Sequence, residues 1–333
     1  MLAEPPLHLP IAEARRGYHG RDGRHGRDGR HGRRRQGAGA LLPAVMLGIA
    51  ALLAPSCLES QADPTSRAMN QPVAPFRILG NLHYVGASDI TSFLLATDRG
   101  LILLDGGFVE TAPQIRDNIA RLGFKPSDVK IILNSHAHYD HAGGLAQLKA
   151  WTGARLFASP GDAPLLEAGG RGDPFFGDTL PFPPVKVDHL LRDGEAVTLG
   201  DTTMVAHVTA GHTRGCTTWT ARVAEGGRHY DVVFVCSTSV LPGYRLVEHP
   251  TYPGIADDYA RTFATLAALP CDVFLGSHAS FYDGAGKARR LREGAEPNPF
   301  VDPQGYRAYL ARAEAAYREQ VVRERTPAAG KRR

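Results

Sequence analysis

Hydrophobic and polar residues alternate over short segments from residue 76 onward, with turn residues between the segments. Such alternation, and short apolar runs bounded by Gly, Asn or Asp, are typical of β-strands. In the first half, the pattern predicts strands at 76–79, 82–85, 91–97, 100–105, 129–134 and 154–158. Apolar residues at helical spacing predict helices at 112–122 and 145–151, each stopped by a following glycine.

The second half repeats this arrangement. The pattern predicts strands at 197–199, 203–209, 217–223, 231–236 and 272–276, and helices at 256–269 and 306–325. Residues 160–186 are rich in Gly, Pro and Asp and predict a long loop that carries Phe175 and Phe176. Two β-rich halves that each contain helices predict an α/β fold, with a pair of sheets covered by helices. Since no linker interrupts residues 63–333, we expect them to form a single domain.

Residues 1–62 have a different composition. HGRDGR occurs twice in succession and HGRRR follows, so residues 19–35 hold no apolar core and are predicted to be disordered. Residues 38–56 form an apolar run after three arginines, which is typical of a secretory signal. A membrane-spanning anchor is the alternative, because the run almost reaches the ~20 residues that a span needs.

The signal predicts export to the periplasm. Small residues at 60–62 offer a cleavage site. Cys57 offers a site for a lipid anchor, although the Leu expected three residues before it is absent. Residues 1–62 are therefore predicted to be a disordered basic repeat followed by a secretory signal.

Charge is concentrated in this leader. It holds 9 of the 38 basic and 5 of the 34 acidic residues, a net charge of 9 − 5 = +4, which leaves 29 of each sign in the rest of the chain. A neutral body gives no electrostatic reason to expect nucleic acid as a partner.

Export also changes the expectation for the three cysteines of residues 63–333, since two of them can form a disulfide in an oxidising compartment. The strands at 217–223 and 231–236 predict an antiparallel hairpin that turns at 224–229, which places Cys216 and Cys236 at its open end. Their Cβ atoms would lie near the ~3.8 Å that a disulfide requires. We predict a Cys216–Cys236 disulfide; two free buried thiols are the alternative.

The most distinctive segment is N-S-H-A-H-Y-D-H-A-G-G at residues 134–144. On a strand, His136, His138 and Asp140 would share one face and His141 would not. On a turn into a helix all four can converge, and Gly143 and Gly144 are expected to provide the conformational freedom for that bend. Imidazole and carboxylate groups suit zinc, whereas calcium would need more oxygen ligands.

Four ligands within six residues exceed what one ion readily accepts, so the spacing predicts two metal ions. Further ligands are available at two predicted strand ends, His212 in T-A-G-H-T and His278 in G-S-H. The remaining histidines of the body are expected to have structural or solvated roles, namely His83, His189, His207, His229 and His249.

The motif H-x-H-x-D-H, followed by G-H-T and G-S-H, resembles the metallo-β-lactamase superfamily from about residue 76 to 278. The resemblance implies a four-layer αβ/βα sandwich with the site at one edge of the two sheets. In glyoxalase II-like and lactonase-like members an aspartate after a later strand bridges the metals. Here C-S-T-S-V follows, without an acid, so the chain resembles the subclass B3 metallo-β-lactamases.

The resemblance implies two Zn²⁺ cofactors. His136, His138 and His212 match the ligands of the first zinc, and Asp140, His141 and His278 match those of the second. The implied reaction is hydrolysis of the β-lactam amide bond in penicillins, cephalosporins and carbapenems by a metal-held hydroxide. Asp140 is the implied catalytic residue, since it would also orient that hydroxide.

Other positions match substrate-binding residues of the family. Ser237 and Ser239, with Thr238 between them, match the serines that bind the substrate carboxylate; a plain turn at a strand end is the alternative. Phe175 and Phe176 are predicted to floor the substrate pocket, with local core packing as the alternative. Asp105 matches a buried aspartate that orients a ligand.

Two other functions remain open. One is an exported dizinc hydrolase of another ester, thioester or lactone. The other is a non-catalytic zinc-binding protein, favoured only by the histidine-rich leader. The expected partner is a small-molecule β-lactam, without nucleic acid and without a membrane for the mature domain; the sequence leaves the oligomeric state open.

Overall fold

The computed structural model describes residues 64–326, which belong to one compact unit. The predictions for the basic repeat, the secretory signal and Cys57 lie outside the described residues. Within 64–326, no helix combines the length and the apolar character that crossing a membrane requires.

Seven strands form the first sheet, in the order β1-β2-β3-β4-β5-β6-β7. They are β1 (Phe76–Leu79), β2 (Leu82–Tyr84), β3 (Phe93–Thr97), β4 (Gly100–Leu104), β5 (Val129–Leu133), β6 (Arg155–Ala158) and β7 (His189–Leu190). The strands pair antiparallel as far as β4 and parallel from β4 to β7. Apart from the exposed Lys130, β5 is apolar and buried on both faces, as a central parallel strand covered on both sides requires.

The second sheet has five strands in the order β12-β11-β10-β9-β8. They are β8 (Ala196–Leu199), β9 (Thr202–Val208), β10 (Thr217–Glu225), β11 (Arg228–Val235) and β12 (Val273–Gly276). β10 and β11 form a hairpin that turns at Gly226 and Gly227, both with positive φ, which suits the twist of a two-residue turn.

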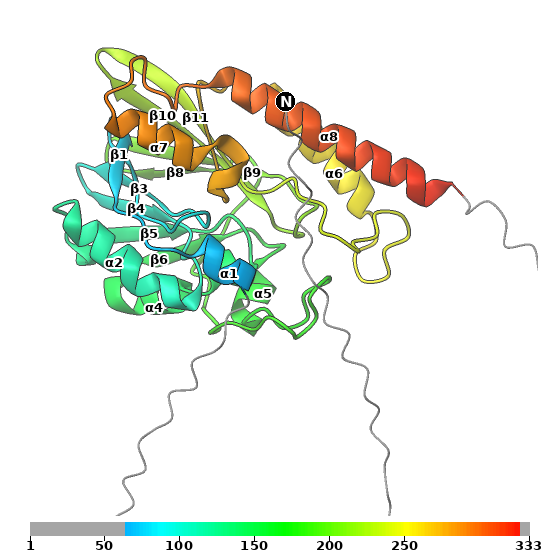
Figure 1. Cartoon of the computed structure of the whole chain (residues 1–333). Coiled ribbons are helices and arrows are strands. Elements are labelled where there is room, and N and C mark those ends of the chain that lie inside the picture. The colour runs from blue at the N-terminus through cyan, green and yellow to red at the C-terminus, as the bar shows by residue number, and fades with distance from the viewer. Residues whose placement is uncertain (1–63, 327–333) are drawn as a thin grey trace, which may run out of the picture. The chain divides into compact units, whose positions relative to one another are not determined.

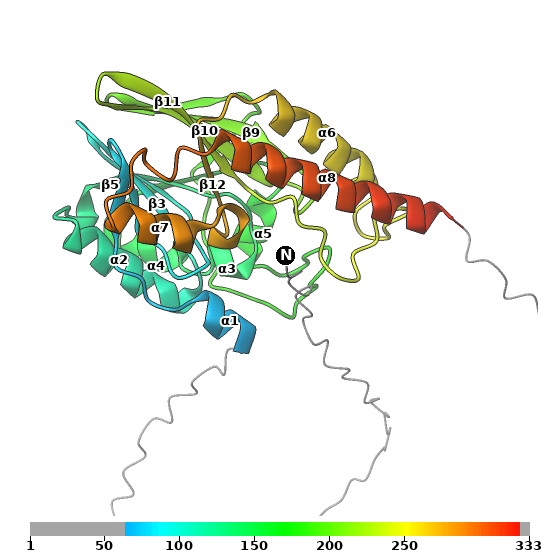
Figure 2. The same cartoon turned by 45° about the horizontal axis from the view of Figure 1, so that its top comes forward.

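The sheets pack face to face, and helices cover their outer faces (Figure 1). The inter-sheet core includes Phe93 of β3 and Phe234 of β11, whose ring centroids lie 5.1 Å apart. α2 (Ala112–Arg121), α4 (Leu145–Thr152) and α5 (Ala163–Ala168) bury apolar residues in a second core against the first sheet. α6 (Ile255–Ala268) and α8 (Pro303–Arg325) lie side by side beyond the second sheet in both views (Figure 2).

Shorter helical segments complete the fold. They are α1 (Pro64–Met69), η1 (Val109–Thr111), η2 (Pro126–Asp128), α3 (Tyr139–Ala142), η3 (Ala279–Tyr282) and α7 (Gly284–Arg292). The predicted four-layer αβ/βα sandwich is therefore confirmed, together with the strands and helices predicted from the pattern.

Four details of the prediction were wrong. The predicted loop at 160–186 contains α5, which is too short for its periodicity to stand out. α7 was missed because its Gly- and Arg-rich sequence carries little apolar signal, and β7 because it has only two residues. α8 begins at Pro303, three residues before the predicted start, with Asp302 accepting the backbone N–H of Gly305 as N-cap.

Candidate metal centre

The central loop of the site joins β5 to α3. The chain leaves the sheet at Leu133, and His138 is the residue that precedes the first turn of α3. This is the predicted turn into a helix, in which neighbouring side chains converge instead of alternating between two faces. His136, His138 and His141 are all buried, and Asp140 is half-buried.

Gly143 and Gly144 were expected to provide conformational freedom for the bend, and this expectation was wrong. Gly143 and Gly144 have φ values of −55° and −84°, which other residues adopt freely. Their lack of a side chain serves close packing, because a Cβ on Gly144 would overlap the carbonyl oxygen of Gly106. The backbone N–H of Gly144 donates to Gly107 O at 3.0 Å, which holds this loop against the end of β4.

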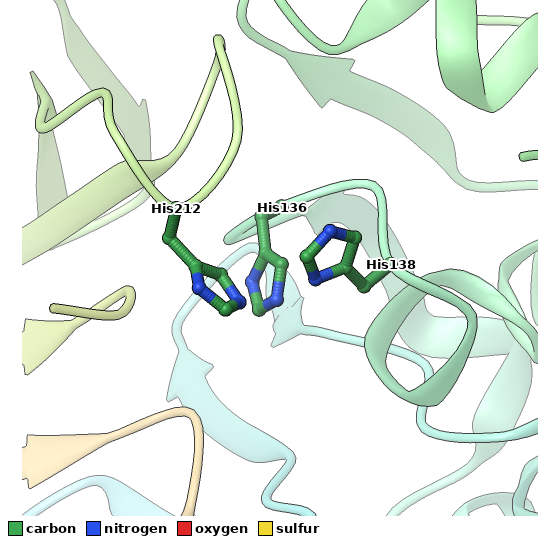
Figure 3. Close-up of side chains that lie close together, drawn as sticks. All are labelled: His136, His138 and His212. Atoms are coloured by element: carbon green, nitrogen blue, oxygen red, sulfur yellow. The ribbon is translucent and has the colours of Figure 1, made fainter. Parts of the chain in front are cut away.

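Three histidines form the first group of the site (Figure 3). His136 and His138 come from the loop after β5, and His212 comes from the loop after β9. Their ring centroids lie 4.6–4.9 Å apart, and one nitrogen of each lies within 4.8 Å of the others. The spacing permits all three nitrogens to bind one ion.

A second group adjoins the first. His141 Nε2 lies 3.2 Å from Asp140 Oδ2 and 3.3 Å from His278 Nε2, and His278 Nε2 lies 3.7 Å from Asp140 Oδ2. His278 directly follows the turn after β12. All six predicted ligands therefore meet at one edge of the two sheets. Among residues 64–326, two sets of donor atoms lie within 4.8 Å of one another, and His136 belongs to both: one set adds His138 and His212, the other Asp140 and His141. His83, His189, His207, His229 and His249 belong to neither set.

The histidines of the site are oriented by their second nitrogens. His212 Nδ1 contacts the carbonyl of Ser239 at 2.9 Å, His278 Nδ1 contacts Asp89 Oδ2 at 2.8 Å, and His136 Nδ1 contacts Ser135 Oγ at 3.0 Å. His136 Nε2 is buried and has no hydrogen-bond partner within residues 64–326. A metal ion would satisfy this nitrogen, so the donor set fits a metal centre.

Burial and mutual repulsion keep two of these histidines neutral. Burial lowers the pKa of His136 well below its usual value, and the neighbouring imidazoles lower it further. Burial and the nearby His138 lower the pKa of His212 to about 3. Partial burial of Asp140 would raise its pKa, but the surrounding histidines, His141 foremost, outweigh this effect and hold the pKa far below the usual range. Neutral imidazole and ionised carboxylate are the forms that bind metals.

Two buried aspartates support the loops of the site. Asp105 directly follows β4 and has a positive φ of 65°, and its Oδ1 accepts hydrogen bonds from Ser135 N and Asn134 Nδ2. Its Oδ2 lies 3.9 Å from His141 Nδ1, next to the ligand that it was predicted to orient. A non-glycine residue with this backbone conformation often marks a functional site.

Asp162 joins the two loops that supply the three-histidine group. Its Oδ2 accepts hydrogen bonds from Ala137 N at 2.9 Å and Thr213 Oγ1 at 2.7 Å, and its Oδ1 accepts from Gly215 N at 2.8 Å. Neither this role nor that of Asp89 could be predicted from the sequence, because each aspartate acts on a loop distant in the chain.

The predicted substrate-binding residues differ in how close they lie to the metal centre. The rings of Phe176 and His138 lie 5.1 Å apart, and Phe175 packs between Phe176 and Tyr244. Ser237 Oγ accepts the backbone N–H of Ser239 at 3.2 Å. Each of these residues therefore borders the metal centre or its supporting loops.

The hydroxyl of Thr238 has a structural partner. It donates to the hydroxyl of Tyr309 on α8 at 2.7 Å, and the side chain is buried. We therefore assign Thr238 to the packing of α8 against the β11 loop.

Cys216 and Cys236 form a disulfide, with Cα atoms 5.9 Å apart, and Cys271 is free. The predicted disulfide is thus present. It lies at the open end of the β10–β11 hairpin, between the loop of His212 and the segment of Ser237 and Ser239.

The family model of the metallo-beta-lactamase superfamily matches residues 85–278. The chain belongs to this superfamily, as the motif predicted.

Within the superfamily the chain is similar to solved metallo-β-lactamases. The native FEZ-1 metallo-β-lactamase from Legionella gormanii is 42% identical, with a TM-score of 0.76 over 78% of this chain and 99% of that chain. The class B3 di-zinc metallo-β-lactamase LRA-12 from an Alaskan soil metagenome is 36% identical, with a TM-score of 0.71 over 75% and 95%. These similarities confirm the predicted resemblance to subclass B3.

Curated relatives match over a shorter length. A hydroxyacylglutathione hydrolase from Fuscovulum blasticum is 28% identical over 178 residues, which are 53% of this chain and 56% of that protein. The chain thus spans about half the length of this relative.

Proposed function

We propose that the protein is a zinc-dependent β-lactamase that hydrolyses the amide bond of penicillins, cephalosporins and carbapenems. The observation that carries the proposal is the convergence of two adjoining ligand groups at one edge of the sandwich. The similarity to class B3 metallo-β-lactamases over almost their whole length supports the same activity.

The residues of the site would hold two zinc ions. His136, His138 and His212 would bind the first, and Asp140, His141 and His278 the second. The unpartnered Nε2 of His136 and the neutral state of His212 support this division. When bound, the two ions would lower the pKa of a water molecule toward neutrality and polarise the β-lactam carbonyl.

The protein's own groups orient the reactants. Asp140 is ionised and lies within the second group, so its carboxylate can accept a hydrogen bond from the attacking water and fix its direction. Ser237 and Ser239 would bind the carboxylate that β-lactams carry beside the ring nitrogen. The carbonyl of Ser239 accepts hydrogen bonds from His212 and from the Tyr259 hydroxyl, which ties this segment to the metal centre.

Phe175 and Phe176 would provide an apolar floor for the substrate side chain. Phe176 lies directly against His138, so a substrate over the first ion would also contact its ring. No acyl-enzyme is needed in this scheme, so neither serine is a nucleophile.

The competing function is hydrolysis of another ester, thioester or lactone, and the similarity to a hydroxyacylglutathione hydrolase favours it. The segment after β11 argues against it. Lactonase-like members carry a metal-bridging aspartate after this strand, whereas the segment here, C-S-T-S-V at 236–240, contains no acid. A non-catalytic zinc-binding protein is the remaining alternative.

A substrate panel separates these functions. Purified zinc-loaded protein would be assayed with a penicillin, a cephalosporin, a carbapenem, an acyl-homoserine lactone and a glutathione thioester. We expect the kcat/KM values for the β-lactams to exceed those for the lactone and the thioester by at least about a hundredfold, a difference of about 2.7 kcal/mol in transition-state binding. Comparable values for the lactone or the thioester would favour the competing hydrolase, and inactivity on all five would favour zinc binding alone.

We also propose that residues 1–62 direct export to the periplasm and that residues 63–333 form the mature hydrolase domain. The disulfide between Cys216 and Cys236 supports an oxidising compartment. Mass determination of the periplasmic form would locate the cleavage site, and full-length protein found only in the cytoplasm would contradict the proposal.

A further inference from the structure

The segment that carries the two phenylalanines is a short closed loop. The backbone N–H of Gly177 donates to Asp173 O at 2.9 Å, and that of Asp173 donates to Gly177 O at 3.2 Å. The backbone N–H of Gly172 donates to Asp178 Oδ1 at 2.9 Å. These bonds fix both ends of the segment, which we call the aromatic loop (residues 173–177).

Asp173 uses its two carboxylate oxygens for different partners. Its Oδ1 accepts the backbone N–H groups of Phe175 and Phe176, each at 2.7 Å. Its Oδ2 lies 3.5 Å from Nε2 of His138, a buried nitrogen without a hydrogen-bond partner among residues 64–326, and both side chains are 5% exposed. One buried carboxylate therefore contacts both the aromatic loop and a residue of the three-histidine group.

The contact completes a pattern seen at the other histidines. A metal-binding imidazole carries its proton on the nitrogen that faces away from the metal and donates it to a protein acceptor. The Ser239 carbonyl and the Asp89 carboxylate face His212 and His278 in this way. The Asp173 carboxylate faces His138 in a similar way. At His138 the nitrogen nearest the acceptor is Nε2, whereas at His212 and His278 it is Nδ1.

We propose that Asp173 is a positioning residue that couples the first metal site to the aromatic loop. Its Oδ2 is the acceptor toward which a proton on Nε2 would point, and a proton held there would leave Nδ1 of His138 to bind the metal. By holding the N–H groups of Phe175 and Phe176, it keeps the Phe176 ring against the same imidazole, at 5.1 Å. The role in substrate binding rests on the proposed function, whereas the role in metal binding does not depend on the substrate.

The variant Asp173→Asn tests the proposed role of Asp173 in metal binding. Asp173→Asn has one acceptor oxygen instead of two, so it can serve the loop amides or His138 but not both, and its NH₂ group would face a proton donor. We expect zinc affinity at the first site, measured by competition with a chromophoric chelator, to fall by roughly ten- to a hundredfold. Asp173→Glu, which retains two acceptor oxygens, should recover part of this loss and serves if the first variant does not fold.

Two matched variants separate the contact of Asp173 with His138 from its contact with the aromatic loop. Asp178→Asn changes a carboxylate of the same region that accepts a hydrogen bond from Gly172 and does not contact His138, so zinc affinity should stay at the wild-type value. Phe176→Ala removes the ring and leaves the carboxylate. It should raise KM for a cephalosporin several-fold without changing zinc affinity.

The outcomes distinguish this inference from the proposed function. If wild type binds zinc and folded Asp173→Asn binds it equally well, Asp173 does not position His138 and the inference is overturned, even if activity falls. If wild-type protein binds no zinc, the proposed function fails together with the inference. If zinc affinity falls as expected but no β-lactam is hydrolysed, the metal part of the inference stands and the proposed function fails.

Discussion

His278 Nδ1 and Asp89 Oδ2 lie 2.8 Å apart, although 189 residues separate them in the chain. The other carboxylate oxygen of Asp89 accepts the backbone N–H of Ser280 at 2.8 Å. Burial alone would lower the pKa of His278, but Asp89 and Asp140 outweigh it and raise the pKa. Asp89 thus fixes the imidazole so that Nε2 faces the second ligand group.

We therefore predict that Asp89→Asn weakens zinc binding at the second site by roughly ten- to a hundredfold, as loss of an outer partner of a metal-binding histidine usually does. Stepwise zinc titration would show one of the two sites weakened and the other unchanged. Asp117→Asn on α2, whose carboxylate pairs only with the exposed Arg116, is the control and should bind zinc as wild type does. Unchanged affinity in Asp89→Asn would contradict the assigned role.

His138→Ala is expected to remove the first zinc. Since loss of an outer partner alone costs up to about a hundredfold, loss of the ligand itself should lower β-lactam kcat/KM by at least that factor. Metal analysis should show the zinc content falling from two ions to one per chain. His207→Ala removes a histidine of β9 whose Nε2 contacts Thr220, and it should retain both ions and most activity. Most activity surviving in His138→Ala would refute the ligand assignment.

Removing the disulfide should lower stability. The disulfide joins residues 20 apart in sequence, and the chain-entropy model assigns about 3 kcal/mol to a loop of this size. We expect the free energy of unfolding of the double variant Cys216→Ser, Cys236→Ser to fall by about this amount in urea titrations. Cys271→Ser is the control and should change stability much less, since Cys271 is half-buried and free of a disulfide.

The thiol of Cys271 should also react slowly. Burial, with Asp272 nearby, raises its pKa to about 12, so the thiolate is scarce at neutral pH. Alkylation of the native protein at pH 7.5 should leave all three cysteines of residues 64–326 largely unmodified. Rapid labelling of Cys216 and Cys236 would show that they are not joined.

Much of this fold and site could be predicted because the signals are local. β5 is a short apolar run, and four of the six proposed ligands follow within eight residues of its end. The disulfide followed from the hairpin, whose two strands are adjacent in sequence. α7 escaped prediction because its packing, not its composition, determines that it is a helix.

Unlike Asp105, three of the supporting aspartates could not be predicted, and the reason is different. Asp89, Asp162 and Asp173 lie in loops, where acids are common and usually solvated. Each gains its role only when the fold brings a distant histidine or backbone amide to its carboxylate. The same holds for Gly144, whose close neighbour Gly106 is distant in sequence.

Zinc titration of chelator-treated protein, followed by hydrolysis of a chromogenic cephalosporin, tests the central claim most directly. We predict no hydrolysis by the metal-free protein, recovery on adding zinc, and saturation at two ions per chain. Hydrolysis by metal-free protein, or inactivity of folded protein that has bound two zinc ions, would contradict the account.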